Sequence, residues 1–256
     1  MRTHQLVLQW IENQLSDGQL AVGGRLPAER SLAEQLQVSR TSVREAIRVL
    51  EAMGVVRAGV GSGPDAGTIV ISDPTAALGS ALRLHVATQH LPVADIVETR
   101  VLLESWAAAH IRPDAPQLEA AAALLDRMDA VGHSPDGTAG AGAGAPAAAA
   151  APASAGTAVD EFLALDVHFH LALADAAGNA VVSAMMGSLR EAIQGYAARL
   201  TANLPDWDAT ASRLREEHRG ILAAIRNNDG GRAAELVAAH IEGYYREAGV
   251  ERPHGA

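Results

Sequence analysis

The run Val38-Ser39-Arg40-Thr41-Ser42-Val43-Arg44-Glu45-Ala46 decides the fold of the first part of the chain. Ser39 is a favourable N-cap residue, and a helix that runs from it to about Met53 sorts its side chains onto two faces. Arg40, Arg44 and Arg48 share one face, and the apolar side chains share another, namely Val43, Ala46, Ile47, Leu50 and Met53. We therefore expect one face of this helix to pack and the other to be cationic.

The segments around this basic helix predict a winged helix-turn-helix domain over residues 1–73. A turn at Gln37-Val38 leads into the basic helix. The other predicted elements are helices over 2–17 and 31–36, followed by β-prone runs over 55–58 and 68–71 that form a hairpin. Three helices followed by a hairpin are typical of a DNA-binding domain.

The glycine-rich segment 59–67 is predicted to be the tip of this hairpin, the wing of the domain. Gly61 and Gly63 would let the backbone approach the minor groove or the phosphates of DNA closely. The alternative is a hairpin end that is merely flexible.

Basic residues gather in this first part of an otherwise acidic chain. The chain has 20 basic and 30 acidic residues, which gives a formal net charge of −10. Residues 1–72 carry seven Arg and seven Asp or Glu, which balance, and six Arg against four Glu within 25–57 leave a local excess of +2. A local positive charge at a helix-turn-helix favours DNA as the partner.

The first turn of the basic helix carries the groups that a DNA-reading helix needs. The hydroxyls of Ser39 and Thr41 and the free backbone N–H groups can bind phosphate. Arg40 and Arg44 can reach O6 and N7 of guanine in the major groove. The alternative for such an arginine stripe is a solvated basic face. The turn before this helix and the hairpin after it favour double-stranded DNA.

Beyond Asp73-Pro74 the sequence predicts helices with almost no strand signal, so the fold class is mainly α. We expect a connecting helix within 74–92, an all-helical effector bundle over 93–248 and a tail over 249–256. The helical segments are 75–89, 93–111, 117–131, 160–177, 180–202, 210–227 and 231–248. The stretch 133–158 is mostly Ala, Gly and Pro and cannot build a core, so a disordered, solvated loop is predicted there.

One carboxylate and three histidines of the helical part form a candidate metal site. Asp166 and His170 lie four residues apart and project from one face of a helix, where both can bind one cation. His218 and His240 lie among apolar residues of two other predicted helices. Each histidine alone could be a satisfied core residue, and Asp166 with His170 could be a surface pair. Four such groups facing one bundle interior would be costly without a cation. His168 points away from this face and is not expected to be a ligand.

The types of residue present limit which metals and ligands the site can bind. The chain has no cysteine, which excludes Cys-ligated zinc, iron–sulfur clusters and thiol nucleophiles. Three imidazoles and one carboxylate suit Zn²⁺, Ni²⁺, Co²⁺ or Mn²⁺ and leave room for water or a bidentate small acid. Arg100 is charged within an otherwise apolar helix. It could pair with Glu104 four residues on, or it could clamp a ligand carboxylate with its planar fork.

These residues together resemble the GntR superfamily of bacterial repressors, in the FadR-like branch with an all-helical, metal-binding FCD effector domain. The helix-turn-helix signature is carried by Leu26-Pro27-Ala28-Glu29-Arg30, by residues 38–46 and by Leu50-Glu51-Ala52-Met53-Gly54. The resemblance implies that operator DNA is contacted by the wing glycines and by Arg30, Arg40, Thr41 and Arg44. It also implies that a divalent metal, with zinc as the first choice, is held by Asp166, His170, His218 and His240.

Further stretches resemble the lactate-responsive repressors of actinobacteria. They are Gly61-Ser62-Gly63-Pro64, Glu98-Thr99-Arg100, Leu204-Pro205-Asp206-Trp207 and His240-Ile241-Glu242-Gly243-Tyr244-Tyr245. This resemblance implies a homodimer that binds a palindromic operator and is released by L-lactate. The alternatives are a repressor that answers another organic acid or the metal itself. A metal-dependent hydrolase or lyase is disfavoured, because the sequence offers no positioned nucleophile or general base, so the protein is not expected to be an enzyme.

No segment of the sequence suggests a membrane or secretion. The first 25 residues lack the apolar run of a signal peptide. No apolar stretch approaches the roughly 20 residues that a bilayer requires. We therefore expect a cytoplasmic protein that has no membrane partner.

Overall fold

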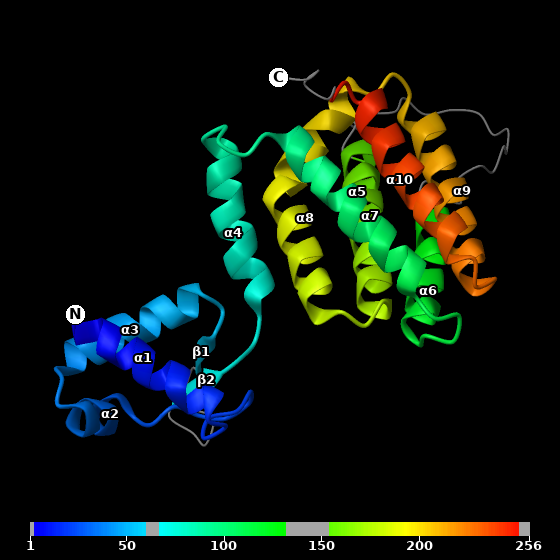
Figure 1. Ribbon diagram of the computed structural model, residues 1–256. Helices are drawn as coiled ribbons and strands as arrows, with labels where there is room; N and C mark the ends of the chain where they lie inside the picture. Colours follow the sequence, from blue (N-terminus) through cyan, green and yellow to red (C-terminus); the bar gives the residue numbers. More distant parts are fainter. Residues whose placement is uncertain (1–2, 60–66, 132–153, 251–256) are drawn as a thin grey trace, which may run out of the picture. The chain divides into compact units, whose positions relative to one another are not determined.

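The computed structural model describes residues 3–59, 67–131 and 154–250 of the chain. It divides into two compact units, Met1–Leu82 and Arg83–Ala256, which are described separately (Figure 1). The glycines predicted at the tip of the wing, Gly61 and Gly63, lie outside the described residues, as does most of the loop predicted at 133–158.

The first unit contains the predicted helices and the hairpin. Its elements are α1 (Thr3–Ser16), α2 (Glu29–Leu36), α3 (Arg40–Ala52), β1 (Val56–Gly59) and β2 (Gly67–Val70). The strands pair antiparallel in a register that sets Val56 opposite Val70 and Gly59 opposite Gly67. Helix α4 (Pro74–Ala87) follows and crosses from the first unit into the second. The winged helix-turn-helix is confirmed.

The sequence of α3 explains both its start and its packing. The hydroxyl of Ser39 accepts a hydrogen bond of 3.0 Å from the backbone N–H of Ser42, which satisfies one free donor of the first turn. The apolar face is buried against α1 and the hairpin, at Val43, Ala46, Ile47 and Leu50. Met53 was predicted on this face and is instead 56% exposed. The helix ends at Ala52, so Met53 no longer follows its periodicity.

Gly54 allows the chain to turn from α3 into β1. Its φ of +70° lies in the left-handed region, and a Cβ atom there would stand 2.0 Å from the backbone oxygen of Asp73. Only glycine meets both requirements, because any other residue adds backbone strain and a steric overlap.

We expect Gly54→Ala to destabilise the first unit by about 2–4 kcal/mol, because strain and overlap add. Gly18→Ala is the matched control: Gly18 has a φ of +69° and nothing within 4 Å of its added Cβ. The control should cost only the strain, about 1 kcal/mol. Thermal and urea unfolding of the two full-length variants measures the difference. Equal losses of stability would show that the approach of Asp73 is unimportant.

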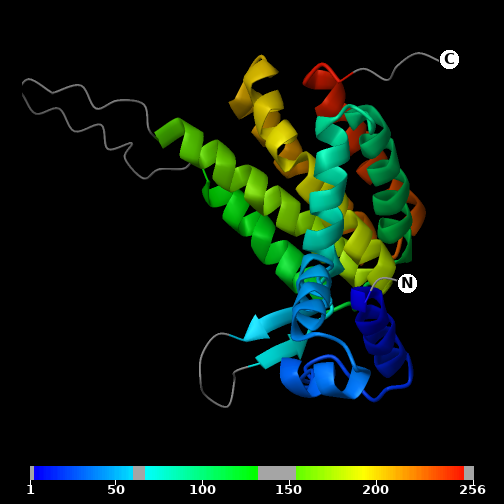
Figure 2. The ribbon, with the colours of Figure 1, turned by 90° about the vertical axis from the view of Figure 1, so that its left-hand side faces the viewer.

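The second unit is a bundle of helices, as the periodicity predicts (Figures 1 and 2). Its helices are α5 (Val93–His110), α6 (Gln117–Ala130), α7 (Ser154–Ala176), α8 (Ala180–Leu200), the 3₁₀ turn η1 (Thr201–Asn203), α9 (Trp207–Arg226) and α10 (Gly230–Glu247). Helix α7 packs between α6 and α8, while α5 contacts α7, α8 and α10. Helix α9 packs against α6 and α10. This arrangement directs side chains of α5, α7, α8, α9 and α10 into one interior.

Helix α7 begins earlier than predicted. It starts at Ser154, so residues 154–158 belong to a helix and not to the predicted loop. After Pro152 no proline interrupts residues 153–176, and each residue added to an existing helix gains one backbone hydrogen bond. Composition alone therefore misplaced this end of the loop.

The part of the chain that the structure describes was also searched for membrane spans. None of its helices combines the length and the apolar character that crossing a bilayer requires.

Candidate functional site

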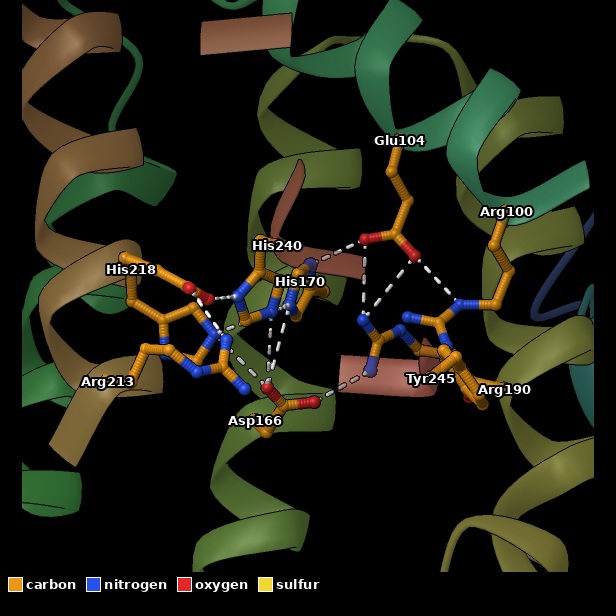
Figure 3. A network of polar contacts seen from close by, with 10 residues as sticks. Arg100, Glu104, Asp166, His170, Arg190, Arg213, His218, His240 and Tyr245 are labelled. Atoms are coloured by element: carbon orange, nitrogen blue, oxygen red, sulfur yellow. Dashed lines mark hydrogen bonds and ion pairs between the residues drawn. The ribbon is translucent and has the colours of Figure 1, made fainter. Parts of the chain in front are cut away.

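Four side chains from three helices converge in the interior of the second unit. Helix α7 supplies Asp166 and His170, α9 supplies His218, and α10 supplies His240 (Figure 3). One nitrogen or oxygen of each residue lies within 4.8 Å of the corresponding atom of every other. The three histidines are buried, with no more than 4% of any of them exposed. The residues predicted as metal ligands are thus brought together.

The separations between these atoms match those of ligands around one ion. His240 Nε2 lies 3.2 Å from the Nε2 atoms of both His170 and His218. Asp166 Oδ1 lies 3.1 Å from His218 Nε2 and 3.6 Å from His170 Nε2. Neighbouring ligands at about 2.0–2.2 Å from a metal are separated by about 2.8–3.1 Å when it is octahedral and by about 3.3–3.6 Å when it is tetrahedral. His240 Nε2 and Asp166 Oδ1 are farther apart, at 4.0 Å. The cluster therefore has the size of a site for a single metal ion.

Carboxylates behind the cluster determine which nitrogen of His170 and of His240 carries the proton. His170 Nδ1 lies 2.5 Å from Glu104 Oε2, and His240 Nδ1 lies 2.8 Å from Glu217 Oε2. A carboxylate can only accept, so each Nδ1–H donates and each Nε2 is left with its lone pair. The lone pairs of His170 and His240 then face each other, and a cation between them removes the repulsion. This is the outer shell usual for metal-bound histidines.

The protonation states of the cluster also suit a metal. Burial lowers the pKa of His218 to about 3, and burial likewise lowers the pKa of His240. Burial alone would raise the pKa of Asp166, but the nearby His170, His218 and Arg190 hold it well below its usual range. At neutral pH His218 and His240 are therefore neutral imidazoles and Asp166 is an ionised carboxylate, the forms that bind metals. The residues present fit a divalent cation.

Glu217→Gln is expected to weaken metal binding by about tenfold to a hundredfold, because the amide holds the His240 imidazole less strongly than the carboxylate does. Glu216→Gln is the control, since Glu216 is the exposed neighbour of Glu217 on α9. Competition with a chromophoric zinc chelator measures both affinities. Wild-type affinity in the Glu217 variant would contradict a role of this carboxylate at the metal.

Two buried arginines stand beside the cluster. Arg100 of α5 donates to Glu104 Oε1 at 2.9 Å and to the Tyr245 hydroxyl at 2.9 Å. Arg190 of α8 donates to Asp166 Oδ2 at 3.1 Å and to Glu104 Oε2 at 3.3 Å. The sequence allowed Arg100 either a pair with Glu104 or a place at a ligand. The pair is present, and Arg100 also lines a cavity.

This cavity has a volume of about 230 Å³ and opens directly onto the cluster. Asp166 and His240 form part of its wall, together with Arg100, Arg190, Tyr244 and Tyr245. Among the residues that the structure describes, Arg190 Nε and the Tyr244 hydroxyl are buried without a hydrogen-bond partner, as is His218 Nδ1. Burial raises the pKa of Tyr244 well above its usual range, so its hydroxyl remains a donor. Two unpaired donors thus line a cavity that adjoins the candidate metal cluster.

Sequence reasoning missed Arg190, Glu217 as a partner of His240, and both tyrosines. Arg190 had the same signal as Arg100, a charge within an apolar helix, and could have been found. Nothing in the local sequence distinguishes Tyr244 from an ordinary core tyrosine. His168 was predicted not to be a ligand, and it lies outside the cluster, on an exposed stretch of α7 with its Nδ1 bonded to the carbonyl of Ala164.

The residues predicted to touch DNA lie on the surface of the first unit. Arg40, Thr41 and Arg44 are exposed on α3. Arg44 Nη2 lies 2.8 Å from Glu29 Oε2, and Arg30 of α2 pairs with Glu34. The hydroxyl of Ser39 serves as the N-cap. Their contacts with DNA stay predictions.

Comparisons with known proteins cover both units. Residues 3–64 match the family of bacterial regulatory proteins named gntR, and residues 95–243, more than half of the chain, match the FCD domain. HTH-type transcriptional regulator LutR of Bacillus subtilis is 29% identical over 247 residues, which cover 91% of this chain and 98% of LutR.

Two further similarities agree with this result. The Escherichia coli protein named "Putative L-lactate dehydrogenase operon regulatory protein" is 26% identical over 89% of this chain and 79% of its own length. The solved structure of a Streptococcus agalactiae GntR protein superposes with a TM-score of 0.62 at 25% identity, over 96% of this chain and 99% of that one. These matches are to regulators of transcription and not to enzymes. The chain belongs to the GntR family of bacterial transcriptional regulators, with an N-terminal helix-turn-helix domain of the gntR type and a C-terminal FCD domain.

Proposed function

We propose that this regulator is a homodimeric repressor whose two winged domains bind the half-sites of a palindromic operator. A small hydroxycarboxylate, L-lactate first, would release it from DNA by binding at the metal site of the second unit. Zinc is the first choice of metal, with nickel, cobalt and manganese as alternatives that the donor set also suits.

The observation that carries this proposal is the cavity shared by the metal cluster and two buried arginines. Asp166 and His240 face it, and so do Arg100 and Arg190. A metal with five or six ligands would keep one or two positions open beside the four protein ligands. A hydroxycarboxylate could occupy them with its hydroxyl and carboxylate oxygens, while an arginine fork binds the carboxylate. The name of the Escherichia coli relative supports lactate among such acids.

Release from DNA requires that the ligand changes the balance between two states of the protein. Helix α4 runs from the first unit into the second, and Arg83 on it lies 3.2 Å from Glu191 of α8. Arg190, which lines the cavity, is the neighbour of Glu191 in the chain. A ligand that binds Arg190 would thus act next to a residue that forms an ion pair with the connecting helix.

The test is a mobility-shift titration of the metal-loaded protein on an operator selected in vitro from random duplexes. L-lactate should release the complex, and pyruvate, glycolate and citrate should be compared with it. If all four acids leave the complex intact while chelation of the metal releases it, the metal itself is the signal and the lactate part of the proposal is wrong.

Tyr244→Phe should lower the affinity for L-lactate by about threefold to tenfold. The Tyr244 hydroxyl has no partner in the protein, so the variant loses only its hydrogen bond to the ligand. Zinc content should not change, since Tyr244 is not in the cluster. Tyr196→Phe is the control, because Tyr196 of α8 lies outside the cavity lining. Calorimetric titration measures the two affinities. Unchanged affinity in the Tyr244 variant would place the acid elsewhere.

A further inference from the structure

The cavity beside the metal cluster has two levels along the bundle. The polar level contains Asp166, Arg190 and His240, with Arg100. The second level lies one helical turn away, about 5.4 Å. Its members are Leu163, three residues before Asp166; Ile193, three after Arg190; Leu214, four before His218; and Tyr244, four after His240.

On each of the four helices, the second-level residue is displaced from the polar level toward the same end of the bundle. Adjacent helices α7 and α8, and α9 and α10, are joined by short turns and run in opposite directions (Figure 1). The second level therefore lies toward the end where α7 and α9 begin and where α8 and α10 end. We call the apolar members of this level, Leu163, Ile193 and Leu214, the apolar collar.

The collar is apolar and largely buried. Ile193 and Leu214 are each 2% exposed, and Leu163 is half-buried. The next polar side chains of the lining, Asp160 and Gln194, are both exposed and lie farther toward the same end. A ligand with its polar head at the metal thus has apolar side chains around the part of it that points outward.

Lactate is too short to use this collar. Its carboxylate and hydroxyl oxygens would lie at the polar level, and beyond them it carries a single methyl group. The collar would then enclose only water, which finds few hydrogen-bond partners among Leu and Ile side chains. A longer alkyl chain would displace that water and bury its own apolar surface.

We infer that this cavity binds α-hydroxycarboxylates with alkyl chains of several carbons, and that it binds them more tightly than lactate. The inference rests on the proposed function, because it places the polar head at the same metal and arginines. It adds that the collar makes the affinity depend on the length of the ligand's alkyl chain. The chemical class of the preferred ligand is therefore an aliphatic α-hydroxy acid.

The experiment titrates the zinc-loaded, full-length protein with L-lactate and with the L-forms of α-hydroxybutyrate, α-hydroxyvalerate and α-hydroxycaproate. Calorimetry should show the dissociation constant falling by about fourfold with each added methylene until the collar is filled. A dissociation constant that stays constant or rises from lactate onward would overturn the inference and leave the proposed function standing. Failure of every acid to bind would overturn both.

Leu163→Phe fills the collar at its half-buried position and should remove the gain with chain length while lactate still binds. Leu163→Asn tests the same point without added bulk, because a polar side chain should also reduce the gain per methylene. Leu171→Phe, on the same helix and outside this cavity, is the control. Zinc content and thermal unfolding verify that each variant is folded. A gain with chain length that survives both Leu163 substitutions would place the alkyl chain elsewhere and overturn the inference.

Discussion

His218→Ala is expected to lower the affinity for zinc by about two to three orders of magnitude. His218 is fully buried, and its Nε2 lies 3.1 Å from Asp166 Oδ1 and 3.2 Å from His240 Nε2. Zinc sites with four protein ligands bind with about 10–16 kcal/mol, so one ligand in four accounts for roughly 2.5–4 kcal/mol. Each 1.4 kcal/mol corresponds to about a factor of ten in affinity. His170→Ala should have a similar effect, because both remove one ligand of the same ion.

Elemental analysis after dialysis, followed by chelator competition, measures this loss. His168→Ala is the matched control, since His168 lies on α7 two residues from His170 and outside the cluster. It should retain wild-type zinc binding. Loss of zinc in the control, or full retention in the His218 variant, would mean that the four converging residues are not the metal site. The His218 variant should also lose its response to hydroxy acids, because their binding requires the metal.

Arg44→Ala is expected to lower the affinity for operator DNA by about one to four orders of magnitude in the dimer. Arg44 is exposed on α3, beside the buried apolar face that contains Val43 and Ile47. Loss of one arginine that reads a base costs about 1–3 kcal/mol, and a dimer loses it at both half-sites. Glu29 holds the guanidinium with two hydrogen bonds, at 2.8 and 3.3 Å, so Arg44 is already oriented away from the core.

Fluorescence anisotropy with the selected operator, at several salt concentrations, tests this effect. Arg232→Ala is the control, because it removes the same charge from an exposed arginine in the second unit, one that pairs with Glu235. The control should bind DNA almost as the wild type does. If both variants bind alike, α3 does not read the operator through Arg44. If Arg44→Ala weakens binding equally on all sequences, this arginine contacts phosphate and not bases.

The two sites differ in how far local sequence could predict them. The DNA-reading surface follows from one helix: the Ser39 cap, the apolar stripe and the arginine stripe all lie within a few turns, so periodicity suffices. The wrong prediction for Met53 also has a local cause, because the apolar face of a helix ends where the helix ends. Asp166 and His170 share one face of α7 for the same reason.

The rest of the metal site depends on how helices far apart in the chain are packed. His218 and His240 reach Asp166 only because α9 and α10 turn these faces toward α7. The same packing sets Glu217 behind His240 and Arg190 beside Asp166. The sequence identified the types of metal ligand. The rotation of each helix about its axis decided which polar side chains lie in contact.

The sequence by itself determined the elements, the family resemblance and the chemistry of the donors, because helix periodicity, capping and residue type are local properties. Only the tertiary structure decided that a cavity adjoins the cluster, that two of its donors have no protein partner, and that an apolar collar lies one turn away. These features arise from side chains of five helices, and their positions depend on the packing of the whole bundle.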